Sequence, residues 1–133
     1  MNSILLYFLI IILFIILDAP YLYLNFAYIK SKAYAISGKD YTKRYYSALI
    51  VYLALALGIL VLVLPRIINK TTWQNRLKDS IIYGGTFGLA SYATFDFTMH
   101  FMFDGWDLSV SIMDSIWGSV LCSIIAFIVS YVN

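Results

Sequence analysis

Four apolar segments dominate this chain and limit what it can fold into. They cover about residues 4–24, 48–64, 80–103 and 108–131, and each is close to the roughly 20 residues that a helix needs to cross the hydrocarbon core of a bilayer. Of the 133 residues, 62% are hydrophobic and 12% are charged, against about 25% charged residues in a soluble domain. The sequence therefore predicts an all-α, integral membrane four-helix bundle, with residues 1–133 forming a single transmembrane domain.

The connections between these segments are short, and alternation places the N- and C-termini on the same side of the membrane. Residues 25–47, rich in basic and aromatic side chains, and residues 104–107 then lie on the other side. The two sides carry five and four Lys or Arg residues, a difference too small to set the orientation. The sequence predicts a multi-pass protein whose partner is the lipid bilayer, in a membrane that it does not identify. A net charge of +2 gives no reason to expect nucleic acid.

Three of the predicted helices carry an aspartate at a similar depth. Asp96 lies nine residues before Gly105 and Asp114 nine residues after it, so two helical arms joined by that turn would hold both carboxyl groups roughly 13 Å from the turn. Asp18 lies about six residues from the end of the first segment on the same side. The sequence therefore predicts an intramembrane three-Asp cluster roughly 10 Å below the membrane surface, to which the second segment contributes no acid.

These acids need polar partners. An ionised Asp at the centre of a membrane helix costs about 2.5–3.5 kcal/mol, and none of the four segments contains Lys or Arg. Three arrangements fit: protonated acids hydrogen bonded to one another and to Ser, Thr or Tyr; a shared cation; or a wet cavity open to one side. No cofactor is predicted and no metal is assigned, although a bound cation or lipid would suit the cluster.

A second set of residues is expected around the acids because they lie on the same or adjoining helix faces. His100 follows Asp96 by one helical turn, a spacing that suits a proton relay or a metal site, although local hydrogen bonding is the favoured interpretation. The full set is Tyr92, Thr98, His100, Ser111, Ser115 and Trp117.

Small residues predict where helices approach closely. Gly84 and Gly88 form a GxxxG pair in the third segment, and Gly118 lies on a small, weakly polar face of the fourth. Such faces let membrane helices pack at short distance. We expect this packing inside the bundle rather than between two copies of the chain.

Residues 91–121 also carry a resemblance to a known family. The relevant residues are Tyr92-Ala93-Thr94-Phe95-Asp96-Phe97-Thr98, Gly105-Trp106, Val110, Asp114, Trp117-Gly118 and Val120-Leu121, with Leu17-Asp18 near the end of the first segment. Together they resemble a family of small four-helix membrane proteins of unknown function, found in bacteria, algae and large DNA viruses. The resemblance implies the fold and the three acids, and it implies no activity.

The chain departs from that family's pattern at three positions. The typical pattern is aromatic-Asp-Leu-Thr-Asn, then Gly-Trp-Pro, then Val-Asp-x-x-Trp-Gly. Met99 stands here for the Asn, His100 for the following residue, usually Leu, and Asp107 for the Pro. Loss of the Asn removes a hydrogen-bond partner for the acids, and His100 is not a family site residue.

Three classes of function fit these observations. The first is a non-enzymatic structural or accessory membrane component, as a homo-oligomer or within a larger membrane or virion assembly, in which the acids specify helix packing. The second is a small proton- or cation-coupled transporter or channel that uses Asp18, Asp96 and Asp114. The third is a membrane enzyme or lipid-binding protein. No residue is assigned as catalytic, and the sequence favours a non-enzymatic role.

Overall fold

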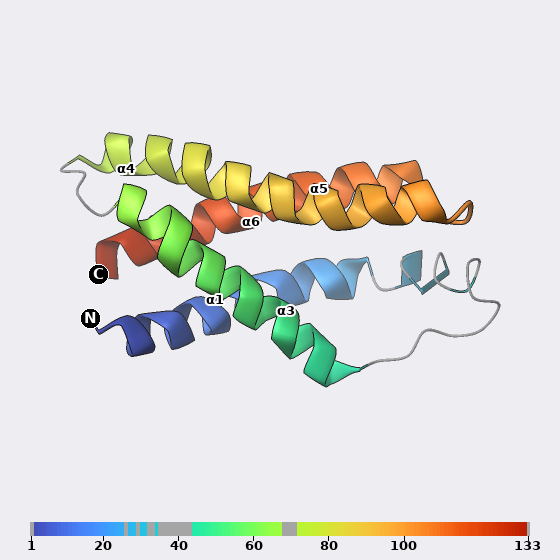
Figure 1. Cartoon of the computed structure of the whole chain (residues 1–133), viewed down its shortest axis with the longest axis horizontal. Helices are drawn as coiled ribbons and strands as arrows, with labels where there is room; N and C mark the ends of the chain where they lie inside the picture. Colours follow the sequence, from blue (N-terminus) through green and yellow to red (C-terminus); the bar gives the residue numbers. More distant parts are fainter. Residues whose placement is uncertain are drawn as a thin grey trace.

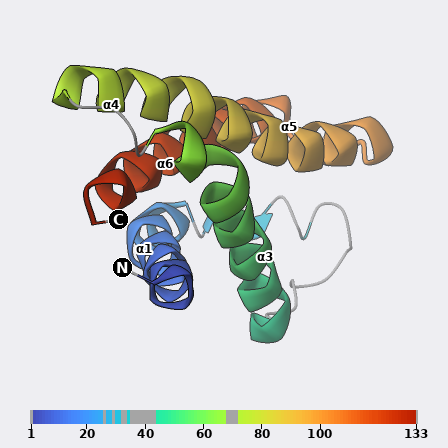
Figure 2. The same cartoon turned by 60° about the vertical axis from the view of Figure 1, so that its left-hand side comes forward.

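The protein is an α-helical bundle in which α3 crosses the other long helices obliquely (Figures 1 and 2). The computed structural model describes residues 2–25, 27, 28, 30, 31, 34, 44–67 and 72–132. The α-helices are α1 (Ser3–Leu24), α3 (Tyr45–Gly58), α4 (Trp73–Asp79), α5 (Gly85–Met102) and α6 (Leu108–Val132). Two π-helical segments, Ile59–Val63 and Ser80–Gly84, and a 3-10 turn, Leu64–Arg66, continue these helices without a break.

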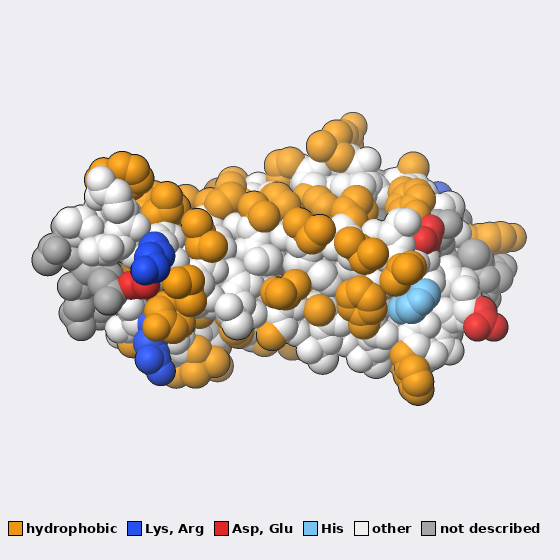
Figure 3. Space-filling view, turned by 90° about the horizontal axis from the view of Figure 1, so that it is seen from above, with side chains coloured by type: hydrophobic (Ala, Val, Ile, Leu, Met, Phe, Trp, Pro, Cys, Tyr) orange, Lys and Arg blue, Asp and Glu red, His pale blue; other side chains and the backbone are white. Residues whose placement is uncertain are grey.

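Three of the helical stretches are long and apolar enough to cross a bilayer: Ser3–Leu24, Tyr45–Arg66 and Leu108–Val132. Their surfaces are apolar between the two ends of the bundle. On the face drawn in Figure 3, Lys, Arg, Asp and His side chains gather at the two ends and hydrophobic side chains cover the middle. This distribution suits a protein that lies across a membrane.

The predicted span at 80–103 is not among these three stretches, and its crossing of the membrane stays a prediction. In the structure α5 lies lengthwise along α6 (Figures 1 and 2). If α6 crosses the membrane, α5 therefore lies in the same part of the bilayer. Both chain termini lie at the same end of the bundle (Figure 1). Their place on one side of the membrane also stays a prediction.

Glycine allows α5 and α6 to come very close. A methyl group on Gly88 would lie 2.1 Å from the carbonyl oxygen of Gly118, and one on Gly84 would lie 2.9 Å from that of Cys122. A methyl group on Gly118 would lie 2.2 Å from the Tyr92 ring. The GxxxG pair therefore packs against α6 inside the bundle, where an extra carbon atom has no room.

The apolar core joins α1, α3 and α6. Phe14 and Ile10 of α1 are completely buried, as are Ala56 and Ile59 in the second helical stretch. The Tyr7 hydroxyl on α1 donates to the Leu53 carbonyl oxygen at 2.7 Å, which adds a polar contact to this packing. Residues from α6 complete the core: Leu121, Cys122, Ile125, Ala126 and Val129.

One expectation about local structure changes. The stretch between the second and third segments is predicted to be a connection, but residues 73–79 form α4, whose N-cap Thr72 accepts a hydrogen bond from the Asn75 backbone at 3.2 Å. The second segment is a member of the bundle that buries Leu55, Ala56 and Ile59 in the core and leaves most of its other side chains exposed. Most of the 25–47 connection lies outside the described residues, so its predicted position at the membrane surface is untested.

Candidate functional site

Asp18 joins three helices through one carboxyl group. Its Oδ2 accepts a hydrogen bond from the Tyr52 hydroxyl of α3 at 2.5 Å, and its Oδ1 accepts one from the Trp117 indole nitrogen of α6 at 2.8 Å. The Asp18 side chain is 6% exposed. Since each oxygen has a donor from a different helix, Asp18 fixes the positions of α3 and α6 relative to α1.

Asp114 is the acid that α6 contributes beside Trp117 and Tyr21. Its Oδ1 accepts a hydrogen bond from the Tyr21 hydroxyl of α1 at 3.1 Å. The Tyr21 ring stacks on the Trp117 ring, with centroids 4.9 Å apart and an angle of 9° between the planes. Because Trp117 also bonds to Asp18, the two acids share one aromatic stack that connects α1 with α6.

Asp96 is the most buried of the three acids and lacks a donor. Its side chain is 1% exposed, and no side-chain or backbone donor in the described part of the chain bonds to either oxygen. Asp114 of α6 is an acidic neighbour of this carboxyl group. Two neighbouring carboxylates repel each other and a buried one is costly, so this burial favours an Asp96–Asp114 pair in which one acid carries a proton.

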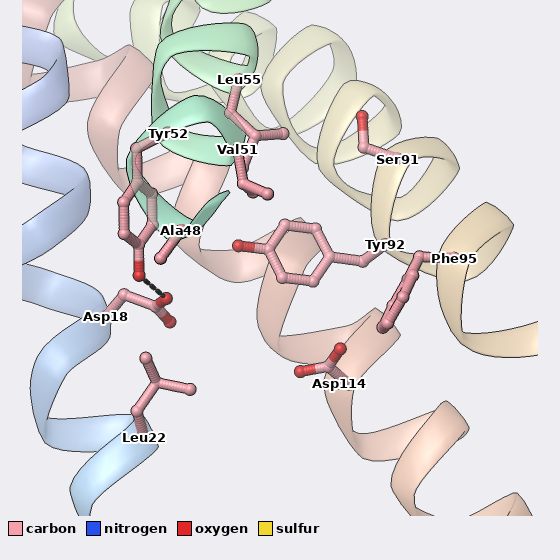
Figure 4. A pocket seen from close by; sticks show the side chains of 10 residues that line it. All are labelled: Asp18, Leu22, Ala48, Val51, Tyr52, Leu55, Ser91, Tyr92, Phe95 and Asp114. Carbon is pink, nitrogen blue, oxygen red and sulfur yellow. Dashed lines mark hydrogen bonds between the residues drawn. The ribbon is translucent and has the colours of Figure 1, made fainter. Parts of the chain in front are cut away.

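A cavity of about 370 Å³ lies beside the acids, and we call it the side pocket. Asp18 and Asp114 line it, and the Tyr92 ring extends from α5 toward Asp18 and Tyr52 (Figure 4). Its remaining walls are mostly apolar. The side pocket is lined by Asp18, Leu22, Ala48, Val51, Tyr52, Leu55, Ser91, Tyr92, Phe95 and Asp114.

The residues expected around the acids fall into two groups. Tyr92 and Trp117 lie at the site, as described above. Ser111 bonds to the backbone near Asp96, since its hydroxyl donates to the Asp96 carbonyl oxygen at 2.9 Å, and Ser115 donates to the Ser111 carbonyl oxygen at 2.7 Å. These two serines contact helix backbone rather than a carboxyl group.

Thr98 and His100 lie on exposed parts of α5 and do not line the side pocket. The His100 Nδ1 lies 2.9 Å from the Trp106 carbonyl oxygen, in the turn that leads to α6. This contact agrees with local hydrogen bonding, which the sequence analysis favours for His100. Asp107 caps α6 in the same turn, because its Oδ1 accepts a hydrogen bond from the Ser109 backbone at 2.9 Å, as the side chain of an N-cap residue does.

The sequence interpretation missed Tyr21 and Tyr52, the two hydroxyl donors of the site. A signal for each was present. Tyr21 follows Asp18 by three residues, which places both on one face of α1. Tyr52 is a phenol within an aliphatic helix, where its hydroxyl needs a partner.

The groups gathered at this site are hydrogen-bond donors and acceptors. Among the described residues, no group of three or more His, Cys, Asp or Glu side chains is placed to hold a metal ion. Asp18 has donors on both oxygens, whereas Asp114 presents an acceptor to the side pocket. The site can therefore hold helices together on the Asp18 side and accept a donor on the Asp114 side.

Comparison with known proteins places the chain in a family. No curated protein and no solved structure matches it. A family profile described as "Predicted membrane protein (DUF2177)" matches residues 3–131, which is nearly the whole chain. Together with the helices of membrane-spanning length, this match shows that the chain belongs to the DUF2177 family of predicted membrane proteins, whose function is unknown.

Proposed function

We propose that this protein is a non-enzymatic structural or accessory component of its membrane, in which the intramembrane aspartates hold the helix bundle in one arrangement. The observation that carries the proposal is the Asp18 carboxyl group, which accepts from Tyr52 of α3 and Trp117 of α6. A buried polar group with partners on several helices penalises every other packing of those helices. A fixed bundle would then present a constant surface to lipid, to further copies of the chain or to a larger assembly.

The Asp96–Asp114 pair supports the same role. A relay group must exchange its proton with a chain of donors and acceptors, whereas Asp96 is almost fully enclosed and has Asp114 as its polar neighbour. A proton held between the two acids would join α5 to α6, next to the close packing of Gly88 on Gly118.

Replacing Asp114 with asparagine separates the structural role from transport. The amide oxygen can still accept from Tyr21, and the amide nitrogen can donate to Asp96, which has no such donor now. We expect the free energy of unfolding in detergent to stay equal or to rise by up to about 1 kcal/mol, the net value of one hydrogen bond. In proteoliposomes we expect the wild-type protein and this variant to show the same proton flux as protein-free liposomes.

A transporter would behave differently. If the wild type conducts protons or another cation well above the protein-free level, and D114N remains folded but loses that flux, the structural proposal is wrong. The variant's circular dichroism and elution volume serve as the control for folding.

A further inference from the structure

The side pocket changes in character from its inner end to its mouth. At the inner end Asp18 is 6% exposed, and the Tyr92 hydroxyl extends toward it (Figure 4). The mouth is formed by apolar side chains that are far more exposed, with Val51 at 54% and Phe95 at 55%. A molecule that matches this gradient has a polar head and an apolar body.

The mouth lies between α3 and α5, on the flank of the bundle. Figures 1 and 2 show α3 diverging from α5 toward its N-terminal end. The α3 residues that line the pocket are Ala48, Val51, Tyr52 and Leu55, and the residues of α3 before Val51 are exposed. In a membrane this flank faces the hydrocarbon chains, so a ligand would enter sideways from the lipid.

The ionisable acids that line the pocket are Asp18 and Asp114. The Asp114 Oδ1 accepts a hydrogen bond from the Tyr21 hydroxyl. The Asp114 side chain also lines the side pocket and has Asp96 as an acidic neighbour. Asp96, which is 1% exposed and has no donor, is not among the residues that line the pocket. Among the residues that the structure describes, no Lys or Arg lines the pocket. The head that complements this end carries hydrogen-bond donors and a positive charge.

We propose that the side pocket binds a lipid-soluble primary amine, with its ammonium group on Asp114 and its apolar tail in the mouth between α3 and α5. A cavity of about 370 Å³ lies at the lower end of the range of small-molecule sites, roughly 300–1,000 Å³. It accommodates one such molecule better than a whole two-chain phospholipid. An ammonium group supplies three donors, which suits the acceptors of Asp114 and Asp18 and the Tyr92 hydroxyl. A hydrated metal ion would gain nothing from the apolar mouth.

Decylamine is the probe for this proposal, with decanoate as the probe of opposite charge. Purified full-length protein in mild detergent micelles is titrated with each, and the unfolding temperature is recorded. A ligand that binds the folded state raises this temperature in a saturable manner. We expect decylamine to do so and decanoate to have no saturable effect.

Matched variants locate the binding. Ala48 and Ala54 are both exposed on α3, but only Ala48 lines the side pocket. A48F should abolish saturable stabilisation by decylamine, while A54F should leave it unchanged. D114N should raise the half-saturating concentration at least about tenfold, the loss expected for one hydrogen bond to a charged group. If A48F fails to fold, D114N still carries the test, since it is expected to remain stable.

Equal responses of A48F and A54F would overturn the proposal, as would stabilisation by decanoate equal to that by decylamine or a wild-type response of D114N. Adding phosphatidylethanolamine to the micelles distinguishes two sources of the amine. Competition with decylamine identifies a lipid headgroup as the occupant, and no competition identifies a free amine. The proposed structural role is independent of this outcome, because it concerns Asp18 and its partners on α3 and α6.

Discussion

Replacing Gly88 with alanine is expected to lower the free energy of unfolding by about 3 kcal/mol or more. Overpacking a well-packed interior typically costs about 1–3 kcal/mol, and here the added carbon would lie 2.1 Å from the Gly118 carbonyl oxygen and 2.7 Å from its carbon. Backbone atoms cannot rotate away as a flexible side chain can. We expect α5 and α6 to separate, with loss of the Asp96–Asp114 contact. Unfolding in detergent, followed by circular dichroism, measures the change.

Gly85 provides the matched control on the same helix. A methyl group there would meet the hydroxyl oxygens of Ser123 at 3.0 Å and Ser119 at 3.2 Å, which can turn aside. The gain in helix propensity from Gly to Ala, up to about 1 kcal/mol, offsets part of that crowding. G85A should therefore stay within about 1 kcal/mol of the wild type. Equal losses in G85A and G88A would show that the close approach at Gly118 is not what limits this interface.

Replacing Asp18 with leucine is expected to lower the free energy of unfolding by about 2–5 kcal/mol, because each buried donor left without an acceptor costs about 1–3 kcal/mol. The two donors are the Tyr52 hydroxyl and the Trp117 indole nitrogen. The measurement is again equilibrium unfolding in detergent. Adding Y52F to D18L removes one of the stranded donors and should restore about 1–3 kcal/mol. A D18L protein as stable as the wild type would contradict a structural role for Asp18.

The sequence was sufficient for the fold class because hydropathy and helix length are local properties. The all-α membrane bundle is confirmed, and the observed helices at Ser3–Leu24 and Leu108–Val132 agree closely with the ranges expected at 4–24 and 108–131. The expected packing of Gly84 and Gly88 within the bundle also agrees with the observed contacts. Counting residues from the α5–α6 turn predicts Asp96 and Asp114 at one level; both arms are helices as that count assumes, and the common level stays a prediction.

The partners of the acids could not be predicted, because they depend on how the helices are rotated. Tyr52 reaches Asp18 only because α3 crosses α1 with that face inward, which no hydropathy pattern specifies. The same limit applies to Asp96. Its depth in the membrane stays a prediction, and its lack of a donor depends on which α6 side chains face it. The role of the three acids together stays a prediction.

The α4 helix shows a different limit. Residues 73–79 contain polar and charged side chains, so hydropathy assigned them to a connection. Their helix is nevertheless capped by Thr72 and continues into Ser80–Gly84. Within it, the Arg76 guanidinium bonds to the Ser130 carbonyl oxygen and lies 4.7 Å from the centre of the Tyr131 ring. These tertiary contacts with α6 are not visible in a local pattern.

A double-mutant cycle between Asp18 and Tyr52 tests most directly whether the aspartate holds the helices together. The free energies of unfolding of the wild type, D18N, Y52F and the double variant give the coupling between the two side chains. Their hydrogen bond of 2.5 Å predicts a coupling of about 1–2 kcal/mol, toward the upper end for membrane proteins. Additive effects, within about 0.3 kcal/mol, would contradict the proposal that Asp18 fixes α3 against α1.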